Sequence, residues 1–183
     1  MRIIAGEAGG GRLETREGMD VRPTPERVKE ALFNILQFQI EGRRVLDLFA
    51  GSGQLGLEAL SRGAAEAVFV DESRASMAVV QRNIASLHME SRSKIFQMDF
   101  ASFLMRRHTP FDIVFLDPPY RSGMLEKALP LVAEVTSPGG TIIAEHPTDE
   151  ELPETAGAFQ KGRSYRYGKI YLTVYRRPEP EQV

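Results

Sequence analysis

The stretch Val45-Leu46-Asp47-Leu48-Phe49-Ala50-Gly51-Ser52-Gly53-Gln54-Leu55-Gly56 decides the fold. Its apolar start predicts a buried strand, and three glycines with the spacing G-x-G-x-x-G follow that strand. The first two glycines permit a tight turn and a close approach of the backbone to a ligand. The third permits close packing of the next helix on the strand. The stretch therefore predicts a strand, a turn and a helix, in the order found in nucleotide-binding α/β proteins.

Strands and helices alternate after this stretch. Apolar runs predict strands over Val45–Phe49, Ala67–Val70, Ile95–Met98, Ile113–Leu116 and Thr141–Ala144. Helical spacing of apolar residues fills the intervals, over Leu55–Ser61, Arg74–Leu87, Ala101–Arg107 and Met124–Glu134. Apolar strands separated by helices indicate an α/β fold with a mostly parallel, doubly wound sheet. Because Gly168-Lys169 separates two further strand-like segments, Ser164–Tyr167 and Ile170–Arg176, we expect an antiparallel C-terminal hairpin.

The first forty residues form a different unit. Two short apolar stretches around Gly9-Gly10-Gly11 predict a small β-hairpin. Thr24 is expected to cap the next helix and Pro25 to take its first position. We divide the chain into an N-terminal hairpin and helix (1–40), an α/β domain (41–177) and a loose tail (178–183).

The composition excludes several classes of protein. The chain is 42% hydrophobic and 26% charged, as in ordinary globular proteins. It contains no apolar run long enough for a membrane helix, and its start does not resemble a signal peptide, so we expect a cytoplasmic protein. It has no cysteine and its three histidines are scattered, so no metal site is expected.

Charge is distributed unevenly along the chain. Residues 45–159 carry 9 Lys and Arg against 16 Asp and Glu, which suits a cationic ligand. Residues 160–177 carry 6 Lys and Arg and no acid. That segment is suited to contact phosphates, although basic side chains also protect the edges of sheets. Its four tyrosines are expected to share one packing face, with Arg166 and its neighbours facing outward.

Acidic residues at the strand ends indicate the ligand. Asp71 lies 20 residues after Gly51, where a carboxylate accepts hydrogen bonds from both ribose hydroxyls. Asp47 lies in an apolar run and needs a partner. A ligand with a sulfonium and an ammonium group supplies one, so S-adenosylmethionine fits better than a nicotinamide dinucleotide. The alternative for Asp47 is a structural acid bonded to loop amides.

The third strand is also followed by an acid. Asp99 stands where a side chain accepts from an adenine amino group, with Phe100 beside the ring. Asp99 is also placed to cap the next helix. Glu145-His146-Pro147 follows the fifth strand, and we expect a strand-end turn there, with an edge of the ligand cleft as the alternative.

Asp117-Pro118-Pro119-Tyr120 is the most specific motif in the chain. The two prolines fix the path by which the chain leaves the preceding strand. Asp117 and the Pro118 carbonyl are two acceptors for the N–H bonds of an exocyclic amine, and Tyr120 offers a ring on which a base stacks. The motif therefore predicts methylation of a base amino group, with positioning and electrostatics doing most of the work.

The chain resembles the class I methyltransferases, and more specifically the bacterial family that methylates N2 of a guanine in 16S ribosomal RNA. The resemblance covers nearly the whole chain. It rests on Arg2-Ile3-Ile4, Gly11-Arg12, Arg22-Pro23-Thr24, Arg27-Val28-Lys29-Glu30-Ala31-Leu32-Phe33-Asn34, Asp47–Gly53, Gly56–Gly63 and Asp117–Tyr120.

The resemblance implies a Rossmann-like fold, S-adenosylmethionine as cofactor and 16S ribosomal RNA as partner, within or outside the small subunit. We expect a monomer. The cofactor would contact Arg22, Thr24, Asp47, Phe49, Ala50, Gly51, Ser52, Gly53, Asp71, Glu72, Asp99, Phe100 and Asp117. The target base would contact Asp117, Pro118, Pro119 and Tyr120, and the RNA would contact Arg2, Arg12, Arg22, Arg166 and Lys169. A DNA adenine-N6 methyltransferase and a non-catalytic RNA-binding protein with this fold remain alternatives.

Overall fold

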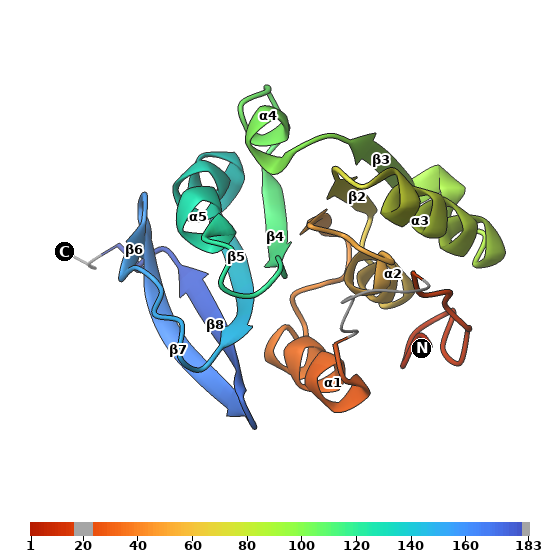
Figure 1. Cartoon of the computed structure of the whole chain (residues 1–183), viewed down its shortest axis with the longest axis horizontal. Helices are drawn as coiled ribbons and strands as arrows, with labels where there is room; N and C mark the ends of the chain where they lie inside the picture. Colours follow the sequence, from red (N-terminus) through yellow and green to blue (C-terminus); the bar gives the residue numbers. More distant parts are fainter. Residues whose placement is uncertain (17–23, 181–183) are drawn as a thin grey trace.

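The computed structural model describes residues 1–16 and 24–180. Its strands form one sheet in the order β3-β2-β1-β4-β5-β8-β7-β6, with helices on both faces (Figure 1). The strands are β1 (Arg44–Leu48), β2 (Glu66–Asp71), β3 (Ser93–Gln97), β4 (Phe111–Leu116), β5 (Thr136–Pro147), β6 (Thr155–Ala156), β7 (Phe159–Tyr167) and β8 (Ile170–Arg176). The helices are α1 (Glu26–Ile35), α2 (Gln54–Ser61), α3 (Arg74–Ser86), the short 3₁₀ helix η1 (Glu90–Arg92), α4 (Phe100–Leu104) and α5 (Met124–Val135).

The predicted α/β fold is confirmed. Strands β1 to β5 pair in parallel, whereas β8 pairs antiparallel with both β5 and β7. The sheet therefore ends in the expected antiparallel strands. Strand β5 runs on to Pro147 instead of turning after Ala144, because Glu145, His146 and Pro147 pair with β8.

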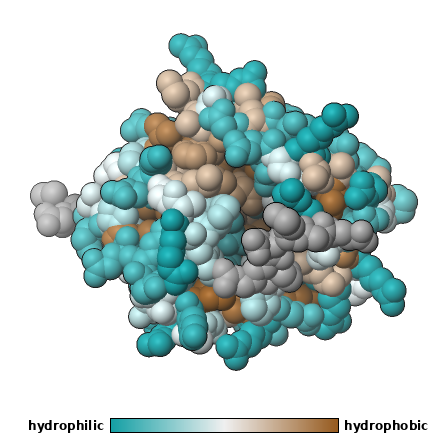
Figure 2. Space-filling view, in the orientation of Figure 1, coloured by the Kyte–Doolittle hydropathy of each residue, from teal (hydrophilic) through white to brown (hydrophobic). Residues whose placement is uncertain are grey.

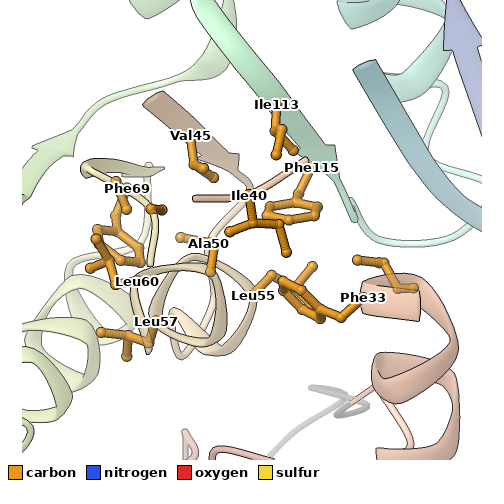
Figure 3. Close-up of a cluster of buried hydrophobic side chains, with 14 of the residues drawn as sticks. Phe33, Ile40, Val45, Ala50, Leu55, Leu57, Leu60, Phe69, Ile113 and Phe115 are labelled. Carbon is orange, nitrogen blue, oxygen red and sulfur yellow. The ribbon is translucent and has the colours of Figure 1, made fainter. Parts of the chain in front are cut away.

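Two hydrophobic layers enclose the sheet. Helices α1, α2 and α3 contribute to one layer, and α4 and α5 contribute to the other. In the first layer, Phe33 of α1 meets Phe115 of β4 with ring centroids 5.6 Å apart, and Leu55 of α2 lies beside them (Figure 3). Burial of these large side chains supplies much of the favourable free energy of folding.

The direction of the strand order reverses between β1 and β4. From β1 the chain proceeds to β2 and β3 on one side, and then returns to place β4 and β5 on the other. Ligands of open α/β sheets bind at such a switch point, beyond the carboxyl ends of the strands. The glycine turn follows β1 and the Asp117–Tyr120 motif follows β4, so the fold brings them to the same edge.

The N-terminal hairpin is short and packs against α2. Arg2 and Arg12 form an antiparallel bridge, and the backbone N–H of Ile3 donates to the Gly11 carbonyl at 2.8 Å. The buried Glu58 of α2 accepts hydrogen bonds from the backbone N–H groups of Ile4 and Ala5. These contacts hold the hairpin close to the helix that follows the glycine turn.

Two local expectations were wrong. Pro25, not Thr24, precedes the first residue of α1, and no side chain among residues 1–16 and 24–180 caps that helix. The tyrosines do not share one face, because Tyr165 and Tyr167 pack with the first hydrophobic layer while Tyr175 belongs to the second. The two-residue turn pairs Tyr167 with Ile170 and Tyr165 with Leu172, so Tyr171 and Tyr175 lie on the opposite face of the sheet from Tyr165 and Tyr167.

Candidate active site

A cavity of about 760 Å³ opens at the carboxyl ends of β1, β2 and β4. This size is ordinary for a site that binds a cofactor or another small molecule. Its walls contain residues of the glycine turn, the ends of β2 and β4, and the start of α4. Apolar side chains gather in a hollow near the middle of the face shown in Figure 2.

The glycine turn reverses the chain between β1 and α2 with left-handed backbone conformations. Phe49, Gly51 and Gly53 have φ angles of 65°, 59° and 81°. Gly56 is required by packing instead, because a Cβ atom there would lie 2.4 Å from the ring of Phe69. The third glycine of the motif thus permits the close helix–strand packing that its spacing predicts.

Asp71 ends β2 at the cavity wall. One carboxylate oxygen accepts from the backbone N–H of Gly51 at 3.0 Å, and the other accepts from the N–H of Ser73 at 2.9 Å. Each carboxylate oxygen has capacity for a further hydrogen bond. Asp71 is therefore fixed in orientation while it retains acceptors for a pair of ribose hydroxyls.

Asp47 lies under the glycine turn and is buried. It accepts from the backbone N–H of Gly56 at 2.9 Å, so the structural alternative of an acid bonded to a loop amide is present. One amide does not compensate for the burial of a carboxylate. Burial raises the pKa of Asp47 to about 8, and the charge of Asp71 adds to the rise. A cation in the cavity would stabilise the ionised form.

The side of the cavity beyond β3 is aromatic. Phe49 and Phe100 place their ring centroids 5.3 Å apart, at an interplanar angle of 55°. Asp99 accepts from the backbone N–H of Ser102 at 2.9 Å, so it caps α4 as expected. Asp99 also lines the cavity, where it could accept a hydrogen bond from the amino group of an adenine that lies against the two phenylalanines.

The Asp117–Tyr120 motif forms the opposite wall, where it meets two residues from distant parts of the chain. The Thr24 hydroxyl lies 3.2 Å from Asp117 Oδ2 and 3.0 Å from Glu145 Oε2. The Tyr120 hydroxyl donates to Glu145 Oε1 at 2.9 Å. We call Thr24, Asp117, Tyr120 and Glu145 the catalytic corner.

Most of the predicted site residues meet at this one cavity. Those lining it are Asp47, Phe49, Ala50, Gly51, Ser52, Asp71, Glu72, Asp99, Phe100, Asp117, Pro118, Pro119 and Tyr120. Gly53 turns the chain behind the wall, and Thr24 reaches the cavity through Asp117. Arg22 lies outside the described residues.

Two residues at the site, Gln54 and Asn83, were missed from the sequence, and a third, Glu145, was considered as an edge of the cleft but expected in a turn. Glu145 is buried at the end of β5 and lines the cavity. Gln54 begins α2, and its buried Oε1 has no hydrogen-bond partner among the described residues. Asn83 of α3 donates to the carbonyls of Ser52 and Glu14, which ties the glycine turn to the N-terminal segment. The position of Glu145 after an apolar strand was the only signal available.

The predicted RNA contacts lie in two exposed groups. Arg2 and Arg12 lie on the N-terminal hairpin, and Arg2 pairs with Glu26 at 2.7 Å. Arg166 and Lys169 lie at the exposed β7–β8 turn, which is adjacent to the end of β5 because Ile170 pairs with Pro147. In Figure 1, α1 lies between the N-terminal hairpin and this turn.

No helix in residues 1–16 and 24–180 is long and apolar enough to cross a membrane. Within the same residues, no cluster of histidine and acidic side chains has the arrangement of a metal site.

Comparisons with known proteins identify the family of this chain. The model of a family described as "Conserved hypothetical protein 95" matches residues 1–176. "Putative rRNA methyltransferase YlbH" of Bacillus subtilis (strain 168) is 38% identical over 97% of this chain and 99% of its own length. "Ribosomal RNA small subunit methyltransferase D" of Escherichia coli (strain K12) is 36% identical over 97% of this chain and 90% of its own length.

Solved structures show the same architecture. The structure titled "Putative methyltransferase yhhF from Escherichia coli" superposes with a TM-score of 0.86 at 36% identity, covering 97% of each chain. The family resemblance inferred from the sequence motifs is confirmed by these relatives and by this structure.

Proposed function

This chain belongs to the family described as conserved hypothetical protein 95, and we propose that it is an S-adenosylmethionine-dependent methyltransferase acting on N2 of a guanine in 16S ribosomal RNA. The names of its relatives support methylation of ribosomal RNA. The observation that carries the proposal is the position of the Asp117–Tyr120 motif, which faces the glycine turn and Asp71 across one cavity.

The side chains that line the cavity fit S-adenosylmethionine. Asp71 offers acceptors for ribose hydroxyls, and Phe49 and Phe100 offer an apolar surface for an adenine ring. The buried Gln54 Oε1 lacks a partner among the described residues, and a cofactor ammonium would supply one. Asp47 completes the set with a buried carboxyl that favours a nearby cation.

When bound, this cofactor supplies an electrophilic methyl carbon on a positively charged sulfur. The residues of the chain hold and orient the groups that react. Asp117 and the Pro118 carbonyl accept from the N–H bonds of the target amine, which directs the nitrogen lone pair toward the methyl carbon. The ring of Tyr120 supports the extruded base. Asp47 favours the cation electrostatically before transfer, and no covalent enzyme intermediate is required.

The exposed basic residues support an RNA substrate. Arg2, Arg12, Arg166 and Lys169 flank α1, whose amino end adjoins Thr24 of the catalytic corner. Phosphates bound along this edge would direct an unpaired guanine toward the cavity. The N-terminal unit of residues 1–40 thus serves as an RNA-binding extension of the catalytic domain, and the protein acts as a cytoplasmic monomer.

A substrate competition tests the proposal. The protein is incubated with methyl-labelled S-adenosylmethionine and with naked 16S ribosomal RNA, small ribosomal subunits or duplex DNA. We expect label in RNA or in subunits and none in DNA, with N2-methylguanosine as the labelled nucleoside. Label in DNA as N6-methyladenine would instead support the adenine methyltransferase. Binding of cofactor and RNA without any transfer would support a non-catalytic protein.

A further inference from the structure

Glu145 has a position that the methyl-transfer chemistry described above does not use. It lies at the end of β5 with 4% of its surface exposed, and it contacts Tyr120 and Thr24 of the catalytic corner. A carboxyl group buried to this degree has a large desolvation cost unless its contacts compensate for it. Of these two contacts, Tyr120 belongs to the motif that is proposed to hold the target base, and Thr24 also contacts Asp117 of that motif.

We propose that Glu145 is a positioning residue that holds Tyr120 by its hydroxyl and shares one proton with Asp117 across Thr24. The inference rests on the proposed function, because it assigns a role within that same site. It concerns only residues of this chain, so it can be tested on the protein without cofactor or RNA.

The geometry around Thr24 carries the first step. Its hydroxyl has a single proton, yet its oxygen lies within hydrogen-bond distance of both Asp117 and Glu145. If the Thr24 hydroxyl donates its proton to one carboxylate, the Thr24 oxygen can only accept a hydrogen bond from the other carboxyl group. That second contact is favourable when the other carboxyl group is protonated and donates to the Thr24 oxygen. The arrangement is therefore satisfied by one proton divided between the two carboxyl groups.

Electrostatics lead to the same conclusion. Among the described residues, the charged groups that act on Asp117 are Glu145 from β5 and Asp47 from β1. Burial and the charge of Glu145 raise the pKa of Asp117 well above its usual range, whereas the Thr24 hydrogen bond lowers it. Two neighbouring carboxyl groups in a buried site do not readily ionise together.

The shared proton has a consequence for the reaction. Methyl transfer would form a bond from the target nitrogen to the methyl carbon, while the bond from that carbon to the cofactor sulfur breaks and its electron pair stays on the sulfur. The methylated nitrogen must then release one proton. The ionised member of the pair accepts that proton, and solvent receives it after the product leaves. Glu145 thus determines how readily Asp117 accepts the proton that the target nitrogen releases. Its contact with the Tyr120 hydroxyl fixes the orientation of the ring on which the base lies.

The test measures the titration of Asp117 directly. The side-chain carboxyl carbons of aspartate are labelled with ¹³C, and the Asp117 resonance is assigned by its loss in Asp117→Asn. We expect Glu145→Gln to lower the titration midpoint of Asp117 by about one pH unit or more, because a neighbouring negative charge is removed. We expect Thr24→Val to raise the midpoint, because a donor to the carboxylate is removed. Glu126→Gln, an exposed change on α5, is the control and leaves the midpoint unchanged.

Opposite shifts in the two variants support the proposal. An unchanged midpoint in Glu145→Gln, or shifts in the same direction, would overturn it. If Glu145→Gln does not fold, the titration of the unaltered protein decides: two separated steps in the Asp117 resonance support the shared proton, and a single step contradicts it. Because neither cofactor nor RNA is present, this outcome is independent of whether ribosomal RNA is the substrate.

A second readout separates positioning from general damage. In methyl transfer, Glu145→Gln should lower kcat about tenfold with KM for RNA unchanged, and it should move the acid limb of the pH profile to lower pH. A purely structural role would lower the amount of active protein without moving that limb.

Discussion

Three carboxyl groups, those of Asp47, Asp117 and Glu145, lie buried or partly buried around one cavity. Burial is the main cause of the raised pKa values of Asp47 and Asp117, and neighbouring carboxylates add to the rise. We therefore expect the site to hold protons and to release them when a cation binds. At the scale of single residues, the binding of a cationic cofactor is thus expected to be coupled to the ionisation of these carboxyl groups.

Asp117→Ala tests the acceptor for the target amine. We expect kcat to fall on the order of 10²–10³-fold, comparable with the loss of one preorganised polar group at a reacting centre. The affinity for S-adenosylmethionine, measured by calorimetry, should fall little, because the cofactor keeps its predicted contacts with the other residues of the cavity. Glu90→Gln, an exposed substitution on η1, is the matched control. Near-full turnover in Asp117→Ala would contradict the assigned role.

The raised pKa of Asp47 predicts a pH dependence of cofactor binding. With a pKa of about 8, Asp47 is mostly protonated at neutral pH, and a sulfonium nearby favours its ionised form. Binding should therefore release protons at neutral pH, and affinity should increase as the pH rises toward about 8 and then level off. S-adenosylhomocysteine lacks the sulfonium charge and should release fewer protons. Calorimetry in buffers of different ionisation enthalpy measures this release, and equal release for both ligands would refute the prediction.

At the scale of elements, the contact of α2 with β2 sets the shape of the glycine turn. A Cβ atom at Gly56 would lie 2.4 Å from the buried ring of Phe69, which cannot move without displacing its neighbours. We expect Gly56→Ala to lower the free energy of unfolding by about 1–3 kcal/mol, the usual cost of overpacking. Chemical denaturation measures the change, with Gly139→Ala, where a Cβ meets open space, as the comparison. Equal stability of the two variants would contradict this account of the packing.

The alternation of elements could be predicted because its signals are local. Apolar runs and helical spacing placed each parallel strand within two residues of its start in the structure except β5, which begins five residues earlier, at Thr136. The glycine turn and the Asp117–Tyr120 motif were recognisable because a few adjacent residues carry their chemistry.

Contacts between distant segments could not be predicted in the same way. Thr24 precedes a helix, which locally favours a cap, yet its hydroxyl reaches Asp117 and Glu145. In the sequence, Gln54 and Asn83 look like ordinary helix residues. Only the fold places Gln54 at the cavity and Asn83 against the N-terminal segment. The face of each tyrosine depended on the pairing across the β7–β8 turn, which periodicity within one strand does not fix.

At the scale of the whole molecule, the N-terminal hairpin, α1 and the β7–β8 turn form one edge. Glu26 of α1 pairs with Arg2, and Arg27 lies beside Gly168 of the turn. We expect Arg166→Glu combined with Lys169→Glu to weaken RNA binding and to reduce the salt dependence by about one unit of slope for each lost phosphate contact. Lys127→Glu on α5 is a charge-matched control for a single reversal. Titrations of RNA into each variant at several salt concentrations measure this dependence. An unchanged slope of affinity against salt concentration would show that this turn does not contact the RNA.

The nucleoside that this protein modifies distinguishes the proposed function from its alternatives. The most direct measurement is mass mapping of modified nucleosides in 16S ribosomal RNA from cells with the protein, cells without it, and cells that carry only Asp117→Ala. We expect one N2-methylguanosine that is present in cells with the protein. It should be absent both from cells without the protein and from cells that carry only Asp117→Ala. A 16S modification pattern identical in all three, or the loss of a methylated adenosine instead, would contradict it.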